Sequence, residues 1–420
     1  MMEILSTGEK IKRARIYNGI TLKQVCEDKI SVSKMSCIEN NKIKSEDWVL
    51  EFISKKLELP MEYLLKDVRE QIEENIGNLE KRIFSSGLEA DLKYNLEYAV
   101  EYNEYDLAFK ILHILFQWYL KEEQFMKIEE MIANYYDICQ KSNGTFDYII
   151  YHQDMAKYFY LNKEYMQAGS YYENIINLLE KNNIKDWDIK GDAVYHSTIC
   201  YNIIGRYDKV RESYNELFKL KDLVKVQLLK ANIYLMLSII EMRTGKESEA
   251  FEMEKTASNL YGNGEDKIQG RIYFFNALIQ LGKTEVALSY MEETIEICKN
   301  EFEHLLGSVL IFLVKNLINE NLLDKAQEKC DEALDCAISS DNIKLIEKAY
   351  FYKAKILQKK GKFSESEMYI NLSLDALMKF GTKAEIQQRY LDMGNMYYTL
   401  GEVKDSLKYF NLSLNLEKQI

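Results

Sequence analysis

Apolar residues recur every three or four positions along most of this chain, in stretches that a glycine or a polar residue interrupts at regular intervals. This period places the apolar residues on one face of a helix, so the stretches predict amphipathic helices. From about residue 90 onward the helices come in pairs joined at one equivalent turn position. The turn positions follow at steps of 37 to 42 residues: Glu123, Lys163, Gly205, Gly245, Gly282, Asn321, Gly361 and Gly401. Eight such pairs predict a solenoid.

The last repeat reads G-x2-Y-x3-G-x4-S-x3-F-x2-S and resembles a tetratricopeptide repeat. We expect the small residues Gly394 and Ser406 to let the two helices approach closely. The aromatic residues Tyr397 and Phe410 should fill the space between the helices, and Gly401 should permit the turn. Five residues after each turn, most repeats carry Ala or Ser: Ile128, Ala168, Val210, Ala250, Ala287, Ala326, Ser366 and Ser406.

The first 66 residues have a different organisation, with five short amphipathic helices between clear start signals. Thr21 and Gln24 have the spacing of a capping box at the start of the second helix. Ser31 should cap the third helix, and Ser45 should begin the fourth. In the third helix, the apolar residues three positions apart should face inward and leave the polar ones outside.

The segments G-E-K-I-K-R-A-R, T-L-K-Q-V-C-E and I-S-V-S-K-M-S-C-I-E-N-N-K resemble the Xre or lambda-repressor-like helix-turn-helix family. The resemblance implies a five-helix DNA-binding domain whose third helix lies in the major groove. Carried over to this sequence, it implies contacts to bases or nearby phosphates from the third helix and backbone contacts around it: Ser33, Lys34, Ser36 and Cys37, then Arg13, Lys23 and Lys42. Leu22 and Cys37 depart from the family, which often has Gln and a basic residue at these positions.

Between the two regions, apolar residues continue at helical spacing through a charged stretch: Val68, Ile72, Ile76, Leu79 and Ile83. We interpret this stretch as a connecting helix that ends at the Ser-Ser-Gly sequence of residues 85–87. The chain is therefore divided into a head (1–66), a connecting helix (67–88) and a repeat array (89–420). The spacing is compatible both with a helix that transmits changes and with a simple spacer.

Arrays of tetratricopeptide repeats form a right-handed superhelix whose first helices line a concave groove. With the turn as position 15, positions 2, 5, 9, 12 and 13 of each repeat should face this groove. They are rich in amides: Gln153, Lys157, Tyr160, Tyr195, Asn202, Asn232, Arg243, Gln269, Asn276, Gln280, Lys315, Asn319, Lys355, Gln358 and Asn395. Carboxamides can hold an extended peptide backbone, and the basic residues suit a peptide carboxylate, although each of these side chains could also simply be solvated.

Composition narrows the class of protein further. The formal net charge is −12, but residues 1–66 carry 12 basic and 10 acidic side chains, so a slightly basic head precedes an acidic array. Seven cysteines without C-x-x-C pairs indicate reduced thiols in a cytosol. We also expect no membrane segment, because the most apolar stretch, residues 233–240, is too short to cross a bilayer. A cytoplasmic location follows.

No catalytic pattern is recognisable. None of the four histidines is spaced for metal binding with another His or a Cys: His113, His152, His196 and His304. The glycines around Tyr261 lack the Lys-Ser or Lys-Thr of a phosphate loop. We therefore expect a protein that is not an enzyme and needs no cofactor or metal.

A helix-turn-helix head followed by repeats of this length resembles the peptide-sensing regulators of Gram-positive bacteria, the Rap, Rgg, NprR, PlcR and PrgX group. The resemblance implies a homodimer that binds a short signalling peptide in its groove and a double-stranded DNA operator through its head. Two alternatives stay open: a Rap-like protein that acts on a phosphorelay response regulator, and a phage repressor controlled by a phage peptide. The apolar face of the last helix, 402–419, predicts the dimer contact.

Overall fold

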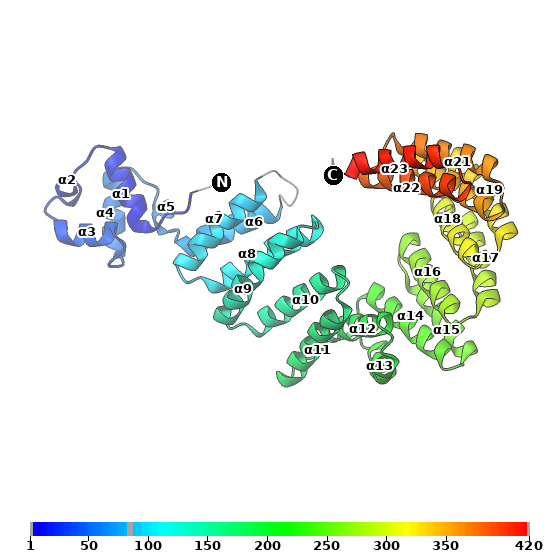
Figure 1. Ribbon diagram of the computed structural model, residues 1–420. Coiled ribbons are helices and arrows are strands. Elements are labelled where there is room, and N and C mark those ends of the chain that lie inside the picture. Colours follow the sequence, from blue (N-terminus) through cyan, green and yellow to red (C-terminus); the bar gives the residue numbers. More distant parts are fainter. Residues whose placement is uncertain (1–2, 82–86, 418–420) are drawn as a thin grey trace. The chain divides into compact units, whose positions relative to one another are not determined.

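The computed structural model describes residues 3–81 and 87–417, and every regular element within these ranges is a helix (Figure 1). The prediction of an all-α fold is therefore confirmed. The chain divides into two compact units, Met1–Leu217 and Phe218–Ile420. The first unit contains the head and the first repeats, and the second contains the remaining repeats.

The head contains the five predicted helices: α1 (Thr7–Tyr17), α2 (Leu22–Cys26), α3 (Val32–Glu39), α4 (Asp47–Leu57) and α5 (Met61–Leu65). The capping box at α2 is present, because the Gln24 amide donates to Thr21 Oγ1 and the Thr21 amide donates to Gln24 Oε1. Ser31 caps α3 by accepting the Lys34 amide at 3.1 Å. The prediction for Ser45 was wrong: α4 begins at Asp47 after Glu46, and neither residue provides a side-chain cap.

The head has its own hydrophobic core, to which α1 to α4 each contribute. Met35 and Ile38 of α3 are buried in it, as their spacing predicted. Gly8 lets α1 lie directly against the end of α3, since a Cβ atom there would be only 2.2 Å from the Ile38 carbonyl oxygen. The orientation of α3 is thus fixed by packing on the rest of the head.

The predicted connecting helix is α6 (Val68–Glu80), and it is followed by α7 (Leu88–Glu101). It is not an isolated spacer, because Ile72 and Ile76 are fully buried in one cluster with Leu92 of α7 and Ile111 of α8. Helix α6 therefore packs as part of the array. Ile83 and the first two residues of the predicted break at 85–87 lie outside the described residues.

The helices that follow form consecutive antiparallel pairs. In the first unit these are α8 (Tyr105–Lys121), α9 (Phe125–Ser142), α10 (Thr145–Leu161), α11 (Tyr165–Lys181), α12 (Trp187–Ile203) and α13 (Tyr207–Leu220), whose last three residues belong to the second unit. The second unit contains α14 (Gln227–Arg243), α15 (Glu247–Leu260), α16 (Gly264–Gln280), α17 (Thr284–Glu301), α18 (Glu303–Asn319), α19 (Leu323–Ser339), α20 (Ile343–Lys359), α21 (Phe363–Leu377), α22 (Lys383–Thr399) and α23 (Val403–Glu417).

All eight predicted turn positions lie between the two helices of a pair and have a left-handed backbone. Their φ values run from 53° at Glu123 to 86° at Gly245. Asn103, between α7 and α8, adopts the same conformation with φ of 61°. Glycine adopts this region without strain and asparagine tolerates it, which explains the residue types found at most turns.

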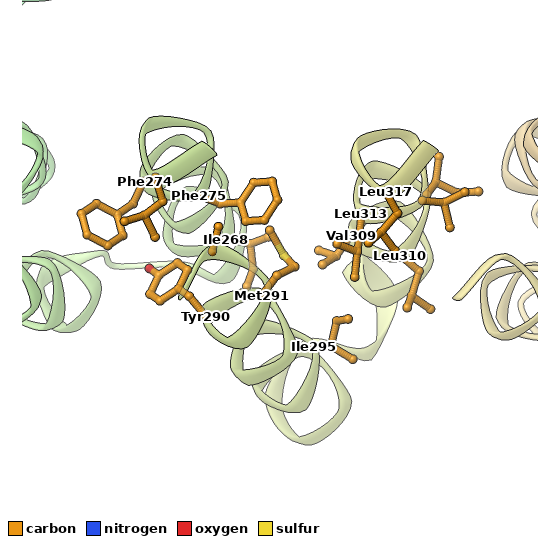
Figure 2. Packing of buried hydrophobic residues seen from close by; sticks show 14 of the residues in the cluster. Ile268, Phe274, Phe275, Tyr290, Met291, Ile295, Val309, Leu310, Leu313 and Leu317 are labelled. Carbon is orange, nitrogen blue, oxygen red and sulfur yellow. The ribbon is translucent and has the colours of Figure 1, made fainter. Parts of the chain in front are cut away.

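The small residues after the turns are buried, as expected. In the last repeat, Ser406 Oγ donates to the Gly394 carbonyl at 2.9 Å, and a Cβ atom on Gly394 would come within 2.6 Å of the Phe410 ring. Within the α16–α17 pair, Phe274 lies beside Tyr290 and Phe275 beside Met291 (Figure 2). Between successive pairs, the rings of Phe275 and of Phe312 on α18 have their centres 5.6 Å apart. Each helix pair therefore uses its neighbours to complete its core.

Candidate nucleic-acid and peptide surfaces

The outer side of α3 carries the residues that the sequence predicted to face DNA. Ser33 is exposed, and Ser36 and Cys37 are partly exposed, while the other side of the helix is buried in the head core. Capping by Ser31 and packing by Met35 hold the helix in place. This side of α3 offers hydroxyl and thiol groups and one cation, Lys34, to an approaching molecule.

Lys34 already has partners within the head. Its Nζ atom lies 2.9 Å from Glu46 Oε1 and 5.5 Å from the centre of the Trp48 ring. The bond from Lys34 also lowers the pKa of the Glu46 carboxyl, with a further contribution from the bond with the Trp48 indole. A DNA phosphate or base would therefore have to compete with Glu46 for this lysine.

The three predicted backbone contacts differ in their surroundings. Lys23 of α2 and Lys42, just after α3, are exposed. Arg13 instead forms an ion pair with Glu3 and lines a cleft of about 360 Å³ between α1, α5 and α6. The sequence could not distinguish these placements, because all three residues lie on polar faces of their segments.

In the first unit, the predicted groove residues lie on α10 and α12. Lys157 is exposed and has no ion-pair partner within the described ranges, and Gln153 and Tyr160 are partly exposed. Tyr195, which we expected to face the groove, is buried, with only 8% of its surface exposed, and its ring centre lies 5.0 Å from that of His196. Asn202 is partly exposed, and its Oδ1 atom is buried without a hydrogen-bond partner.

A buried carboxylate that the sequence analysis missed lies next to these residues. Asp154 of α10 is 1% exposed and accepts hydrogen bonds from Tyr135 Oη at 2.7 Å and Gln117 Nε2 at 2.5 Å. His113 Nδ1 lies 2.7 Å from the same carboxylate. Burial, and then the charge of Asp154, raise the pKa of Tyr135, which therefore keeps its proton and donates.

His113 and Gln117 occupy groove positions 5 and 9 of the repeat whose turn is Glu123. The positional rule could have found them, had it been applied to one repeat earlier. Since Gln117 donates its amide nitrogen to Asp154, its carbonyl oxygen is left as an acceptor. Asp154 thus orients two further polar side chains of the first unit.

In the second unit, the predicted groove residues lie on the first helix of each pair. They are Asn232 and Arg243 on α14, Gln269, Asn276 and Gln280 on α16, Lys315 and Asn319 on α18, Lys355 and Gln358 on α20, and Asn395 on α22. All are exposed or partly exposed, in contrast to the buried residues between them. Asn232 Oδ1 accepts a hydrogen bond from Tyr261 Oη at 3.0 Å, so part of the hydrogen-bonding capacity of this amide is already used within the protein.

The basic residues of this surface are not equivalent. Lys355 Nζ lies 3.0 Å from Asp392 Oδ1 on α22, which neutralises a charge that we expected to face a peptide carboxylate. Arg389 lies beside the same carboxylate at 3.6 Å and bonds to the buried Glu347 at 2.5 Å. Lys315 is exposed and has no ionic partner in the described part of the chain. It is thus the better placed of the two lysines to bind an anion.

Asp154 and Asp392 occupy the same repeat position, nine residues before their turns at Lys163 and Gly401. Each accepts a bond from position 9 of the preceding repeat, Gln117 in one case and Lys355 in the other. In these two repeats, the residue at position 6 therefore connects the first helix to that of the preceding repeat. The sequence analysis missed these aspartates because position 6 was not among the positions expected to face the groove.

No group of three or more metal-ligating side chains occurs among the residues described, and all seven cysteines are free thiols. Within the same residues, the helices are too short or too polar to span a membrane.

Comparisons with known proteins give matches only among solved structures. No protein-family model and no curated protein matches the chain. The apo form of the quorum sensor NprR from B. thuringiensis is 14% identical, with 84% of this chain and 100% of that one covered and a TM-score of 0.43. Aspartyl phosphate phosphatase F from Bacillus subtilis is 12% identical, with 99% and 96% covered and a TM-score of 0.39.

PlcR from Bacillus thuringiensis, in complex with the peptide PapR7 and DNA, is 13% identical, with 91% of this chain and 98% of that one covered and a TM-score of 0.28. NprR and PlcR are members of the group that the sequence resembles. Because the identities lie below 25% and the TM-scores below 0.5, the functional proposals that follow rest on the chain's own residues.

Proposed function

We propose that this protein is a transcriptional regulator whose DNA binding is controlled by a short peptide held on the inner faces of its repeats. The observation that carries the proposal is α3, which is capped by Ser31, buried on one side through Met35 and Ile38, and polar on the other. A helix held this way can enter a major groove without losing its packing. A head of this kind has no evident use in a protein that only binds other proteins.

DNA binding would use the outer side of α3 for bases and the flanking lysines for phosphates. Ser33 and Ser36 can donate to or accept from base edges, and Lys23 and Lys42 can neutralise phosphates. Lys34 would exchange Glu46 for a DNA partner. Since these lysines would neutralise phosphates and release bound counterions, affinity should fall as the salt concentration rises.

Peptide binding would use the amides on the first helices of the pairs. Carboxamides such as Asn276 and Gln269 can accept from a peptide amide and donate to its carbonyl at the same time. Lys315 would bind a carboxylate, and Gln117 and His113 extend the polar surface of the first unit. These groups recognise a backbone regardless of most of its side chains, as a peptide receptor requires.

We further propose that the protein is a homodimer assembled through α23. Val403, Leu407 and Leu414 recur on one face of this helix and are each more than half exposed. Two copies related by a two-fold axis would bury this face and present two heads to adjacent half-sites. Light scattering at micromolar concentration should give twice the chain mass, and a monomer would contradict the dimer.

The DNA part is tested by fluorescence anisotropy on the protein's own upstream DNA and on a scrambled duplex, at one salt concentration. We expect tighter binding to the upstream DNA. Lys42→Ala should weaken binding to both duplexes alike, whereas Ser33→Ala should reduce the difference between them. Lys379→Ala, an exposed residue of the second unit, is the matched control. Equal affinity for both duplexes would contradict the proposal and favour the response-regulator alternative.

A further inference from the structure

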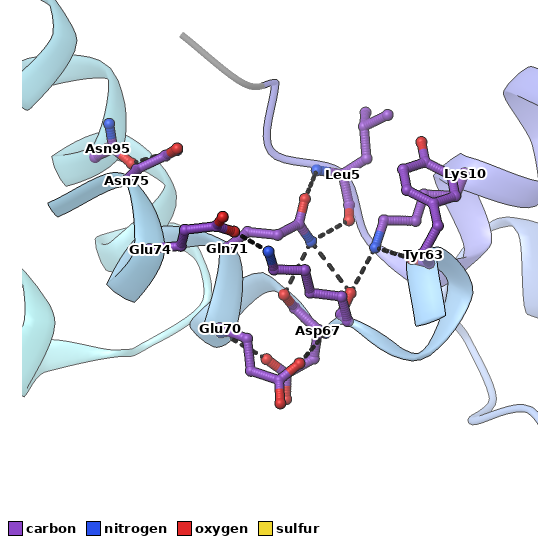
Figure 3. A network of polar contacts seen from close by, with 10 residues as sticks. Leu5, Lys10, Tyr63, Asp67, Glu70, Gln71, Glu74, Asn75 and Asn95 are labelled. Atoms are coloured by element: carbon purple, nitrogen blue, oxygen red, sulfur yellow. Dashed lines mark hydrogen bonds and ion pairs between the residues drawn. The ribbon is translucent and has the colours of Figure 1, made fainter. Parts of the chain in front are cut away.

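The segment that precedes α1 leaves the head and enters the core of the array. Ile4 is fully buried in the cluster formed by α6 to α10, and its amide donates to Tyr94 Oη of α7 at 3.2 Å. Leu5 makes two hydrogen bonds with one side chain of α6: its amide donates to Gln71 Oε1 at 3.2 Å, and its carbonyl accepts from Gln71 Nε2 at 2.9 Å (Figure 3).

The joint between head and array is held from the opposite side by a buried lysine. Lys10 of α1 is 1% exposed, and its Nζ atom donates to the carbonyls of Tyr63 at 2.7 Å and Lys66 at 2.5 Å. These carbonyls belong to the last turn of α5 and to the residue that caps its C-terminal end, where a cation is favourable. Gln71 Nε2 also lies 2.9 Å from the Asp67 carbonyl, at the start of α6. The backbone at residues 66–67 is therefore bonded by side chains from both parts (Figure 3).

The same segment reaches the end of α3. Asn41, directly after the helix and its cap, donates from Nδ2 to Ser6 Oγ at 2.7 Å. Thr7 Oγ1 donates to the Leu64 carbonyl at 3.1 Å. Three consecutive residues, 4 to 6, thus contact α7, α6 and the end of α3 in turn. A shift of α6 or α7 cannot occur without stretching these bonds or moving the head.

We propose that Ile4, Leu5, Ser6, Lys10 and Gln71 form a junction lock, which fixes the head on the first helices of the array and transmits their movement to α3. This regulatory role rests on the proposed function, whereas the mechanical role of the lock does not. Of the two possibilities that the sequence left open for α6, the proposal assigns the helix the transmitting role, because both its apolar face and its Gln71 side chain contact neighbouring elements.

The mechanical role is tested on the full chain by hydrogen exchange. Gln71→Ala removes the bonds to Leu5 and to the joint, so we expect the amides of residues 4–6 and 67–71 to exchange about fivefold faster, the factor for losing one net hydrogen bond. Amides in the core of α3 should be unaffected. Lys55→Ala, an exposed residue of α4, is the control. Unchanged exchange in Gln71→Ala would overturn the lock.

The regulatory role is tested by anisotropy on the upstream DNA with a synthetic candidate peptide, taken from the C-terminal end of any short secreted reading frame found beside the gene. Gln71→Ala should still select this DNA but lose at least half of the peptide-dependent change in affinity. Ile4→Ala is the second variant and should behave alike. A full peptide response in variants with faster exchange would overturn the lock as a relay. Absence of DNA selectivity in the wild type would instead defeat the proposed function and leave the exchange result to decide the lock.

Discussion

Single side chains of the array differ in whether their charge is already balanced inside the protein. Lys355 is paired with Asp392, whereas Lys315, at the same position of the preceding repeat, is exposed. The two lysines look alike in sequence. Only the residue at position 6 of the following repeat separates them: Asp392 after Lys355, and Tyr352 after Lys315.

Substitution of these two lysines should therefore have unequal effects on peptide binding. Lys315→Met should weaken a peptide with a free C-terminal carboxylate by about tenfold, the loss expected for one charged hydrogen bond, and should have little effect on the amidated form. Lys355→Met is the matched variant and should change affinity less. Isothermal titration with both peptide forms measures this, and equal losses for the two forms would contradict the assignment.

His152 of α10 should make the stability of the first unit depend on pH. Burial lowers the pKa of this imidazole, and its Nδ1 atom has no hydrogen-bond partner. The unfolded chain binds a proton below about pH 6.5 while the folded chain does not, so stability falls as the pH drops through that value, by up to about 1.4 kcal/mol per pH unit.

This prediction is checked by measuring the free energy of unfolding in urea from pH 7.5 down to values below the unfolded-state pKa of about 6.5. His152→Phe should have a shallower dependence of the unfolding free energy on pH than the wild type. His304→Asn, at an exposed position, should keep the wild-type slope. The account fails if His152→Phe and the wild type have the same slope.

Adding a single methyl group at Gly394 tests how closely α22 and α23 approach each other. Gly394→Ala places a methyl group against the Phe410 ring and should destabilise the α22–α23 pair by about 1–3 kcal/mol. Gly77→Ala, in the interior of α6 with open space around it, should instead stabilise its helix by about 0.5–1 kcal/mol. Hydrogen exchange of the two helices measures both effects. If exchange changed equally in the two variants, the packing of α22 against α23 at Gly394 would be looser than the structure shows.

Helix pairs are the elements that the sequence predicted best, because turn and packing requirements act locally. A left-handed turn restricts its residue type, and a close crossing restricts side-chain size, so Gly401 and Ser406 could be identified from spacing alone. The start of α4 was misplaced because Ser45 has the chemistry of a cap but not the position. The burial of Tyr195 could not be predicted, because the positional rule does not indicate how deeply neighbouring residues bury a ring.

Contacts between pairs were beyond the sequence because they join residues far apart in the chain. The bonds that Asp154 makes to α8 and α9, and the packing of α6 on α7 and α8, depend on which faces meet. Periodicity shows that a face is buried but not what covers it. The same limit applies to Arg13, whose ion pair with Glu3 turns it toward the cleft between head and array.

A buried ion pair between α20 and α22 allows an element-scale test. Glu347 and Arg389 have side chains that are 5% and 11% exposed, and Ser373 of α21 also donates to Glu347 at 2.7 Å. Glu347→Ala leaves the buried guanidinium with only the Asp392 carboxylate, which is 3.6 Å away and already paired with Lys355, and should cost about 3–5 kcal/mol. The double variant Glu347→Met, Arg389→Met should be more stable than Glu347→Ala in urea unfolding. A double variant that is no more stable would mean that the charges themselves contribute little.

At the scale of the whole molecule, the chain combines a basic head of five helices with an acidic array whose inner positions are amide-rich. The head offers a packed helix with a polar outer side, and the first helices of the array offer groups suited to a peptide backbone. The junction lock connects them through residues 4–6. This combination, more than any single residue, supports regulation of DNA binding by a peptide.

The most direct test of this account is fluorescence anisotropy of the full protein on its upstream DNA and on scrambled DNA, at fixed salt, with and without the candidate peptide. We expect selective binding whose affinity changes with peptide, and Asn276→Ala should remove the change while preserving basal binding. Binding that does not distinguish the two duplexes, with or without peptide, would contradict the central claim.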